Sequence, residues 1–261
     1  MDRKHNTDLT INARTLRKNT KKEIIVFDKD GTLIDFDDFW VSVSISAVNE
    51  VLSIIGKEEI NIEKILNAFG VENGVTDIDG ILCKGTYEEL GLALHDILKE
   101  YGCEQTAEKT VDMLTNAYKN NSYSGVIKPT CDNLKDALTH LKNQGRKLVI
   151  VTTDNYEITY KCLDKLGIKE LFDAVFADDG TMPVKPDPSC ILEYFKANGI
   201  SADSAVMVGD TMTDVRFARN AGMNIIAVGK TEKNRQRLMS HADYVVDDVS
   251  YIHDIIEVYE K

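Results

Sequence analysis

Long apolar runs are scarce in this sequence of 261 residues, and none reaches the roughly 18 residues that a membrane-spanning helix needs. We therefore expect no membrane segment. Cysteine is also sparse, with five scattered residues, an odd number, and no C-x-x-C spacing that would indicate a metal or redox pair. We interpret these cysteines as reduced thiols, which are typical of a cytoplasmic protein. None of the five histidines falls in a motif, which argues against histidine-based catalysis.

Basic residues are outnumbered, with 31 Lys and Arg against 43 Asp and Glu and a net charge of -12. Nucleic acid and anionic membranes would both repel such a chain, so neither is expected as a partner. The basic residues gather at the start, where residues 1–22 lack the apolar stretch of a targeting signal. We predict that residues 1–22 form a polar, basic extension.

Short runs rich in β-branched residues predict strands that are buried on both faces. Segments with helical periodicity lie between the later runs, and this alternation indicates a parallel sheet covered by helices. The predicted fold class is therefore α/β, with a Rossmann-like, doubly wound parallel sheet. The predicted strands are Ile24–Phe27, Leu148–Val151, Ala174–Ala177, Ala205–Val208 and Ile225–Val228, followed by an edge strand at Tyr244–Val246 and a closing helix at Tyr251–Tyr259. The helices expected between them include Tyr156–Leu166, Pro188–Asn198 and Asp214–Ala221.

About 120 residues separate the first two predicted strands, far more than one crossover helix needs. Residues 37–124 show helical patterns with almost no strand signal, so we predict an inserted helical domain there. The α/β core would then comprise residues 23–36 and 125–261. The helices expected in the insertion are Phe39–Ile55, Ile62–Phe69, Tyr87–Tyr101 and Ala107–Lys119.

Two carboxylates follow the first predicted strand, Asp28 and Asp30, and their spacing lets both point toward one side of the strand end. Placing two acids together at a buried strand end is costly unless a cation lies nearby, and hard oxygen ligands suit Mg²⁺. Gly31 then allows the chain to turn sharply. This pattern predicts a magnesium site.

Other strand ends carry complementary groups: Thr152, the Lys185-Pro186 pair, and Asp210 with Asp214 four residues later. Because the carboxyl ends of parallel strands open on one edge of a sheet, we expect these side chains to converge with Asp28.

The four motifs, D-x-D-G-T, a strand-terminal Thr, Lys-Pro and G-D-x-x-x-D, resemble in type and order those of the haloacid dehalogenase superfamily. The insertion after the first motif resembles the helical (C1-type) cap of its phosphoglycolate phosphatase-like subgroup. The resemblance runs from residue 23 over nearly the whole chain.

This resemblance implies that Asp28 attacks phosphorus and forms an aspartyl-phosphate, while Asp30 acts as general acid and base. Thr152 would hydrogen-bond a phosphate oxygen, together with backbone N–H groups near Lys29 and Thr153. Lys185 would offset the charge of the phosphate. The implied Mg²⁺ ligands are the Asp28 carboxylate, the backbone carbonyl of Asp30 and the Asp210 carboxylate, with Asp214 at the metal or orienting its bound water.

Simpler interpretations accompany several of these residues. Asp210 or Asp214 alone could be a helix N-cap. Asp35, Asp37 and Asp38 are interpreted as capping residues, and Thr86 with Glu89 as a capping box. Lys84 precedes a predicted helix N-terminus, where a cation is unfavourable, so it is a candidate for substrate contact as well as a solvated side chain. Lys29 replaces the family's more usual apolar residue and is either a surface lysine or an added charge near the leaving group.

The leading hypothesis is a Mg²⁺-dependent phosphatase that acts on a small phosphate monoester. A phosphomutase of the β-phosphoglucomutase type would share every core motif. A catalytically silent binding module with the same fold is the third hypothesis.

Overall fold

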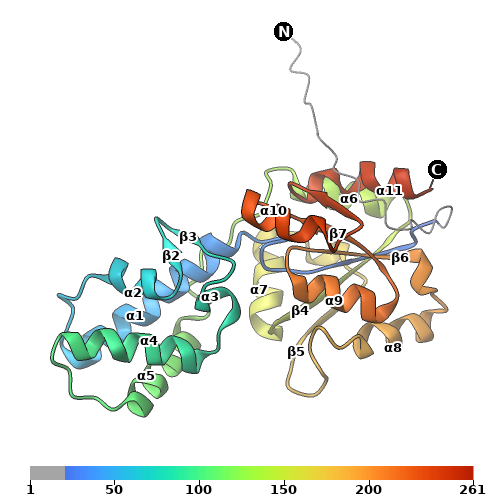
Figure 1. The fold of residues 1–261 in the computed structure, drawn as a ribbon. Helices are drawn as coiled ribbons and strands as arrows, with labels where there is room; N and C mark the ends of the chain where they lie inside the picture. Colours follow the sequence, from blue (N-terminus) through green and yellow to red (C-terminus); the bar gives the residue numbers. More distant parts are fainter. Residues whose placement is uncertain (1–20, 261) are drawn as a thin grey trace, which may run out of the picture. The chain divides into compact units, whose positions relative to one another are not determined.

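The computed structural model describes residues 21–260 and divides them into two compact units. The inserted unit is Asp35–Lys128, and the rest of the described chain forms an α/β unit (Figure 1). Most of the predicted extension, residues 1–20, lies outside the described residues. The last residue of the predicted extension, Lys22, is fully buried. Its Nζ donates to the Asp203 carbonyl at 2.6 Å and to Asn224 Oδ1 at 2.8 Å. Lys22 therefore belongs to the folded core and not to a polar extension.

The α/β unit is built on a six-stranded parallel sheet in the order β5-β4-β1-β6-β7-β8. Its central strands are buried along their whole length, as expected for a parallel sheet covered on both faces. All predicted strands are confirmed, with β8 at the edge. The strands are β1 (Ile24–Phe27), β4 (Lys147–Asn155), β5 (Ala174–Asp178), β6 (Ala205–Gly209), β7 (Asn224–Val228) and β8 (Tyr244–Val246).

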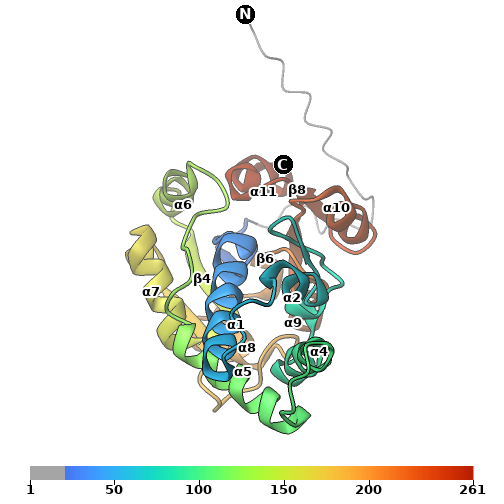
Figure 2. The same cartoon turned by 90° about the vertical axis from the view of Figure 1, so that its left-hand side faces the viewer.

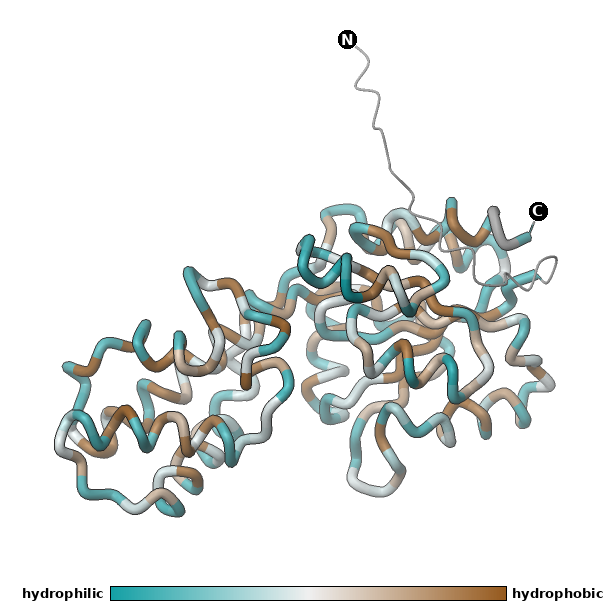
Figure 3. The backbone as a smooth tube through the Cα atoms, in the orientation of Figure 1, coloured by the Kyte–Doolittle hydropathy of each residue, from teal (hydrophilic) through white to brown (hydrophobic). Residues whose placement is uncertain are grey.

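Helices cover both faces of this sheet (Figure 2). Apolar residues of α8, α9 and α10 pack with one face of the strands in a single buried cluster, and α6, α7 and α11 lie on the other side. The hydropathy colouring follows this arrangement, with hydrophobic strands and a strongly hydrophilic α10 (Figure 3). The helices are α6 (Leu134–Asn143), α7 (Tyr156–Leu166), α8 (Ser189–Asn198), α9 (Met212–Ala221), α10 (Glu232–Met239) and α11 (Ile252–Glu260), with short 3-10 turns at Lys169–Leu171, Ala202–Ser204 and Val249–Tyr251.

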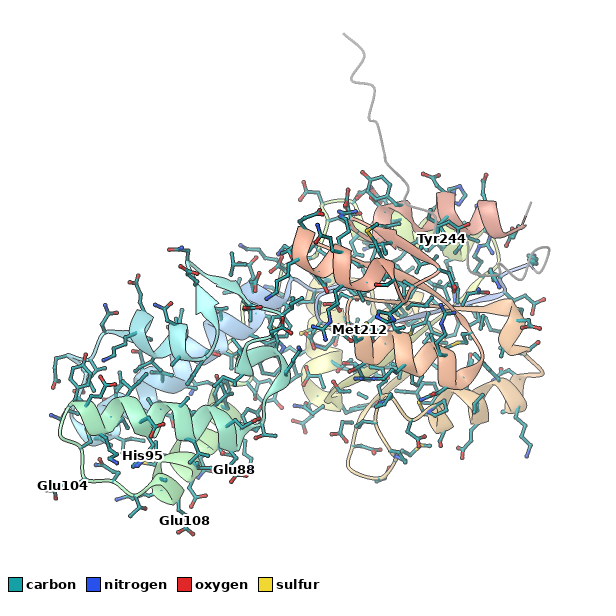
Figure 4. The ribbon with its side chains drawn as sticks, viewed as in Figure 1. Glu88, His95, Glu104, Glu108, Met212 and Tyr244 are labelled. Carbon is teal, nitrogen blue, oxygen red and sulfur yellow. The ribbon has the colours of Figure 1, made fainter. Side chains whose placement is uncertain are left out.

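The inserted unit is mainly helical. Helix α5 packs against both α1 and α4, and Leu90, Leu94 and Leu114 contribute to its buried core. The predicted capping box of Thr86 and Glu89 is confirmed. Glu88, Glu104 and Glu108 are exposed on this unit (Figure 4). Its elements are a π-helical turn (Asp37–Val41), α1 (Ser42–Ile55), α2 (Ile62–Ala68), β2 (Val71–Glu72), β3 (Val75–Thr76), α3 (Ile81–Lys84), α4 (Tyr87–Glu100) and α5 (Ala107–Asn121).

The expectation of almost no strand in the insertion overlooked a small hairpin. Strands β2 and β3 pair antiparallel around Asn73 and Gly74, which both have positive φ, 52° and 78°. Asn-Gly is the preferred dipeptide of a type I′ hairpin turn, because both central residues must adopt the left-handed conformation. The local turn signal was therefore present in the sequence.

One continuous helix, Asp37–Ile55, modifies the expectation about membrane segments. It is 19 residues long with a mean hydropathy of 1.3, so by length and composition it could cross a membrane. A core helix of a water-soluble protein passes the same test. About 44% of its most apolar window is buried within the structure, and Val43, Val48 and Val51 belong to the core of the inserted unit. We interpret it as a core helix.

Candidate active site

The candidate site lies where β1, β4 and β6 end at the same edge of the sheet. Asp28 follows β1, Thr152 lies near the end of β4, and Asp210 follows β6. The backbone N–H of Asp28 donates to the Val208 carbonyl at 2.9 Å, which fixes Asp28 beside the end of β6. Met212, labelled in Figure 4, is the first residue of α9 and lies two residues after Asp210. The predicted convergence at one sheet edge is thus present among these residues.

Lys185 joins two of the predicted carboxylates. Its Nζ lies 2.5 Å from Asp28 Oδ1 and 2.6 Å from Asp214 Oδ1, and all three side chains are at least 90% buried. Burial disfavours the ammonium form, yet the two carboxylates raise the pKa of Lys185 above its ordinary value. Lys185 is therefore a fixed cation within this site.

Asp210 contacts the first motif through the turn that follows β1. Gly31 has a φ of 82°, and a Cβ at this position would lie 2.1 Å from Asp210 Oδ2. Thr32 Oγ1 donates to Asp210 Oδ1 at 3.2 Å, and Asn234 Nδ2 donates to the Asp210 carbonyl at 3.0 Å. Glycine is thus required both by the turn and by the close approach of the Asp210 carboxylate.

Three carboxylates gather here with too few cations to balance them. One oxygen from each of Asp28, Asp210 and Asp214 lies within 4.8 Å of the others. Burial, only partly opposed by Lys185, raises the pKa of Asp28 to about 7, and burial with repulsion from Asp28 and Asp214 raises the pKa of Asp210 well above 3.8. With one ammonium among three acids, the ionised cluster carries a net charge of −2, which a divalent cation would neutralise. All the donors are hard oxygens, so the residues present fit Mg²⁺.

Asp214 has both of its oxygens engaged within the protein. Oδ1 contacts Lys185, while Oδ2 accepts from the Thr211 backbone N–H at 3.0 Å and from Thr211 Oγ1 at 2.5 Å. Thr211 is the N-cap of α9, and Asp214 completes its capping box. The interpretation of Asp210 or Asp214 as the N-cap itself is therefore wrong. Asp214 holds Lys185, and its part in metal binding stays a prediction.

The side chain of Lys29 is completely buried, unlike that of a typical surface lysine. Its Nζ is 2.6 Å from Asp30 Oδ1 and 2.8 Å from Asp154 Oδ2. The interpretation as a solvated surface lysine is wrong, and a contact of Lys29 with the substrate stays a prediction. Thr152 is buried and accepts a hydrogen bond from the Asp154 N–H at 3.1 Å, whereas Thr153 is exposed.

A pocket of about 120 Å³ lies beside Thr152 and Lys185 in the α/β unit. Its walls are largely apolar and include Tyr156, Phe176 and Met182. Thr152 and Lys185 therefore contribute to the lining of a small concavity.

Lys84 lies in the inserted unit and does not precede a helix N-terminus directly. It is the last residue of α3, where a cation is favourable, and its Nζ forms an ion pair with Asp79. The dipole argument that singled out Lys84 is therefore wrong. Asp35, Asp37 and Asp38 also bond within this unit, since Asp35 accepts from the Asp38 N–H and Asp37 accepts from Thr76.

Three residues near the site were not singled out by the sequence: Thr32, Asp154 and Asn234. Thr32 is the last residue of D-x-D-G-T, so the motif itself contained that signal. Asp154 lies two residues after Thr152 in β4, and an extended chain places such residues on one side. Asn234 comes from α10 and has no local signal, because its contact depends on the tertiary fold.

The family model described as haloacid dehalogenase-like hydrolase matches residues 83–228, more than half of the chain. This chain belongs to the haloacid dehalogenase-like hydrolase family. The matched region includes Thr152, Lys185, Asp210 and Asp214, while Asp28 precedes it. The resemblance seen in the motifs is confirmed, and the protein is an enzyme of this hydrolase family.

Two bacterial relatives of this haloacid dehalogenase-like hydrolase carry functional names. A phosphoglycolate phosphatase of Psychrobacter arcticus is 28% identical over 207 residues, covering 79% of this chain and 83% of the relative. A pyrophosphatase PpaX of Bacillus mycoides is 26% identical over 239 residues, covering 90% and 97%. A crystal structure described as a predicted phosphoglycolate phosphatase from Haemophilus somnus has a TM-score of 0.66 at 21% identity and covers 90% of this chain and 98% of its own. That structural likeness confirms the fold.

Proposed function

We propose that this enzyme is a Mg²⁺-dependent phosphatase that hydrolyses a small phosphate monoester through an aspartyl-phosphate on Asp28. The observation that carries the proposal is the buried contact of 2.5 Å between Asp28 and Lys185 within a cluster of three carboxylates. A phosphate dianion approaches an ionised carboxylate only where fixed positive charge offsets the repulsion. Lys185 supplies part of that charge.

The chemistry divides into two displacements. An oxygen of Asp28 attacks phosphorus, the bond from phosphorus to the ester oxygen breaks, and Asp30 gives its proton to the leaving oxygen. A water oxygen then attacks the same phosphorus, its proton goes to Asp30, and the bond to Asp28 breaks. Asp30 is suited to this exchange because its side chain is 16% exposed, more than the 9% of Asp28, and so can meet a leaving group or water.

The carboxylates of Asp28 and Asp210 and the backbone carbonyl of Asp30 would hold Mg²⁺. When bound, Mg²⁺ supplies the positive charge that Lys185 alone does not, and so lowers the barrier to phosphoryl transfer. Asp214 would hold Lys185 in place through Oδ1 while Thr211 fixes its other oxygen. Thr152, with backbone N–H groups near Lys29 and Thr153, would bind the phosphate oxygens.

The substrate class follows from the insertion and from the relatives. We assign the inserted helical unit the role of a cap, which would favour small esters over large phosphorylated molecules. Phosphoglycolate and pyrophosphate are the first substrates to test, because relatives bear those names. A cytoplasmic location and the absence of nucleic-acid and membrane partners stay predictions.

The test is phosphate release from a panel containing phosphoglycolate, pyrophosphate, sugar phosphates, pyridoxal phosphate and p-nitrophenyl phosphate, with Mg²⁺ or with EDTA. We expect Asp28→Asn to abolish turnover while the exposed-site control Asp254→Asn retains it. Folded wild-type protein that releases no more phosphate than Asp28→Asn would instead support the silent module. Isomerised sugar phosphate without net phosphate release would indicate the mutase.

Lys84 is tested in the same panel. We propose that it contributes to substrate choice, so Lys84→Ala should change the ranking of substrates. Lys99→Ala, an exposed lysine of the same unit, should leave that ranking unchanged. An unchanged ranking in Lys84→Ala would remove Lys84 from the substrate-binding residues.

A further inference from the structure

Lys29 is a buried cation shared by two carboxylates at the start of the site. Its ammonium lies 2.6 Å from Asp30 Oδ1 and 2.8 Å from Asp154 Oδ2. The exposed fractions of the Lys29, Asp154 and Asp30 side chains are 0%, 7% and 16%. A buried ammonium is costly without partners, so this position is set by the two acids.

The position of Lys29 in the chain separates it from the carboxylate cluster. Asp28 contacts Lys185, whereas the neighbouring Lys29 contacts Asp30 and Asp154. Asp30 thus pairs with a different ammonium from the one that Asp28 contacts. Lys29 is shared with Asp154, and Lys185 is shared with Asp214.

Asp154 is itself held firmly at the end of β4. Its backbone N–H donates to Thr152 Oγ1 at 3.1 Å, and its Oδ1 accepts from the Asn155 N–H at 2.7 Å. Asn155 is the N-cap of α7, where its Oδ1 accepts from the Ile158 N–H at 2.9 Å. Asp154 is therefore a rigid anchor that links Lys29 to the predicted phosphate-binding residue Thr152.

We propose that Lys29, anchored by Asp154, is a positioning residue that holds the Asp30 carboxyl group where it can protonate the leaving oxygen. This inference rests on the proposed function, in which Asp30 is the general acid. A short aspartate side chain that is 16% exposed can rotate away from a substrate, and small misplacements of a catalytic group are expensive. One oxygen of Asp30 is directed to Lys29, which leaves the second for proton transfer.

The experiment compares kcat/KM for phenyl phosphate and p-nitrophenyl phosphate. Phenolate is the poorer leaving group and needs the proton, whereas p-nitrophenolate leaves without one. We expect Lys29→Met to lower kcat/KM by about 100-fold for phenyl phosphate and by less than about 10-fold for p-nitrophenyl phosphate, as loss of general-acid catalysis requires. Asp30→Asn should likewise lower kcat/KM more for phenyl phosphate than for p-nitrophenyl phosphate. The exposed control Lys165→Met should change neither value.

A double variant separates positioning from charge balance. Lys29→Met leaves Asp154 buried without its cation, but Lys29→Met/Asp154→Leu removes both charges and should restore stability without restoring the ratio of the two kcat/KM values. Equal losses on both esters would overturn the inference, since a merely structural role lowers both alike. Recovery of the wild-type ratio in the double variant would overturn it as well.

A crystal structure of the double variant gives a reading independent of turnover. We expect the Asp30 carboxyl group to leave its present position, and an unmoved Asp30 would overturn the inference. If wild-type protein hydrolyses neither ester, the proposed function fails, and the position of Asp30 in that structure still decides whether Lys29 holds it. Normal wild-type turnover with an unchanged ratio in Lys29→Met rejects the positioning role alone.

Discussion

Asp28→Asn should make the metal-free protein more stable while abolishing its activity. The pKa of Asp28 rises from 3.8 to about 7 because burial disfavours its charge. Each pKa unit corresponds to about 1.36 kcal/mol, so keeping Asp28 ionised at pH 8 costs on the order of 4 kcal/mol. Removing this cost stabilises the variant, but a buried Asn amide with imperfect hydrogen-bond partners costs about 1–2 kcal/mol. The expected net gain is about 2–3 kcal/mol.

The difference in stability between Asp28→Asn and wild type depends on pH. Because the pKa of Asp28 is higher in the folded chain than in the unfolded chain, its contribution favours the folded state at low pH and is lost as the pH rises through about 7. The difference between variant and wild type should therefore grow from about pH 4 to pH 7 and then level off.

The assay is urea unfolding in EDTA from pH 4 to pH 8 for wild type and Asp28→Asn. Added Mg²⁺ should stabilise wild type more than the variant, because a ligand that binds only the folded state raises its stability. A variant that is less stable than wild type at pH 8, or a difference that does not change with pH, would refute the reasoning.

Three further predictions concern the cation site. Mg²⁺ affinity, measured by calorimetry, should weaken by at least about tenfold per pH unit below pH 7, because Asp28 must lose a proton to bind the metal and the raised pKa of Asp210 adds to the dependence; a pH-independent affinity contradicts this. Gly31→Ala should reduce turnover by more than about 100-fold, since its Cβ would collide with Asp210 Oδ2 and misplace a metal ligand, and near-normal kcat would show that the turn can adjust. Asn234→Ala should cost about 1 kcal/mol of unfolding free energy and weaken Mg²⁺ binding by calorimetry, because it removes the bond to the Asp210 carbonyl; unchanged affinity would restrict Asn234 to stability.

The strands were predictable because a parallel sheet buried on both faces needs continuous apolar runs. Ile24–Phe27 and Tyr244–Val246 match the structure end to end, and Leu148–Val151 falls within the longer β4. Helix α10 had no such signal. Its sequence is strongly polar, with Leu238 as its buried apolar side chain, so tertiary packing and the N-cap at Thr231 define it.

The candidate site was predictable where each residue follows a strand, as with Asp28 and Asp210. The environment of Lys29 was not, because a lysine between two aspartates looks the same in sequence whether it is solvated or buried. Its burial depends on Asp154, which is more than a hundred residues away in the chain. Both oxygens of Asp214 are likewise occupied by partners that the four-residue spacing alone does not specify.

The proposed function requires that Asp28 become phosphorylated during turnover. Wild-type protein mixed with Mg²⁺ and p-nitrophenyl phosphate, quenched in acid and digested at low pH, should yield a peptide containing Asp28 that carries one phosphoryl group and loses it on treatment with hydroxylamine. The same peptide from Asp28→Asn should carry none. Steady phosphate release by wild type with no modified peptide at any quench time, or with the phosphoryl group on another residue, would contradict the account.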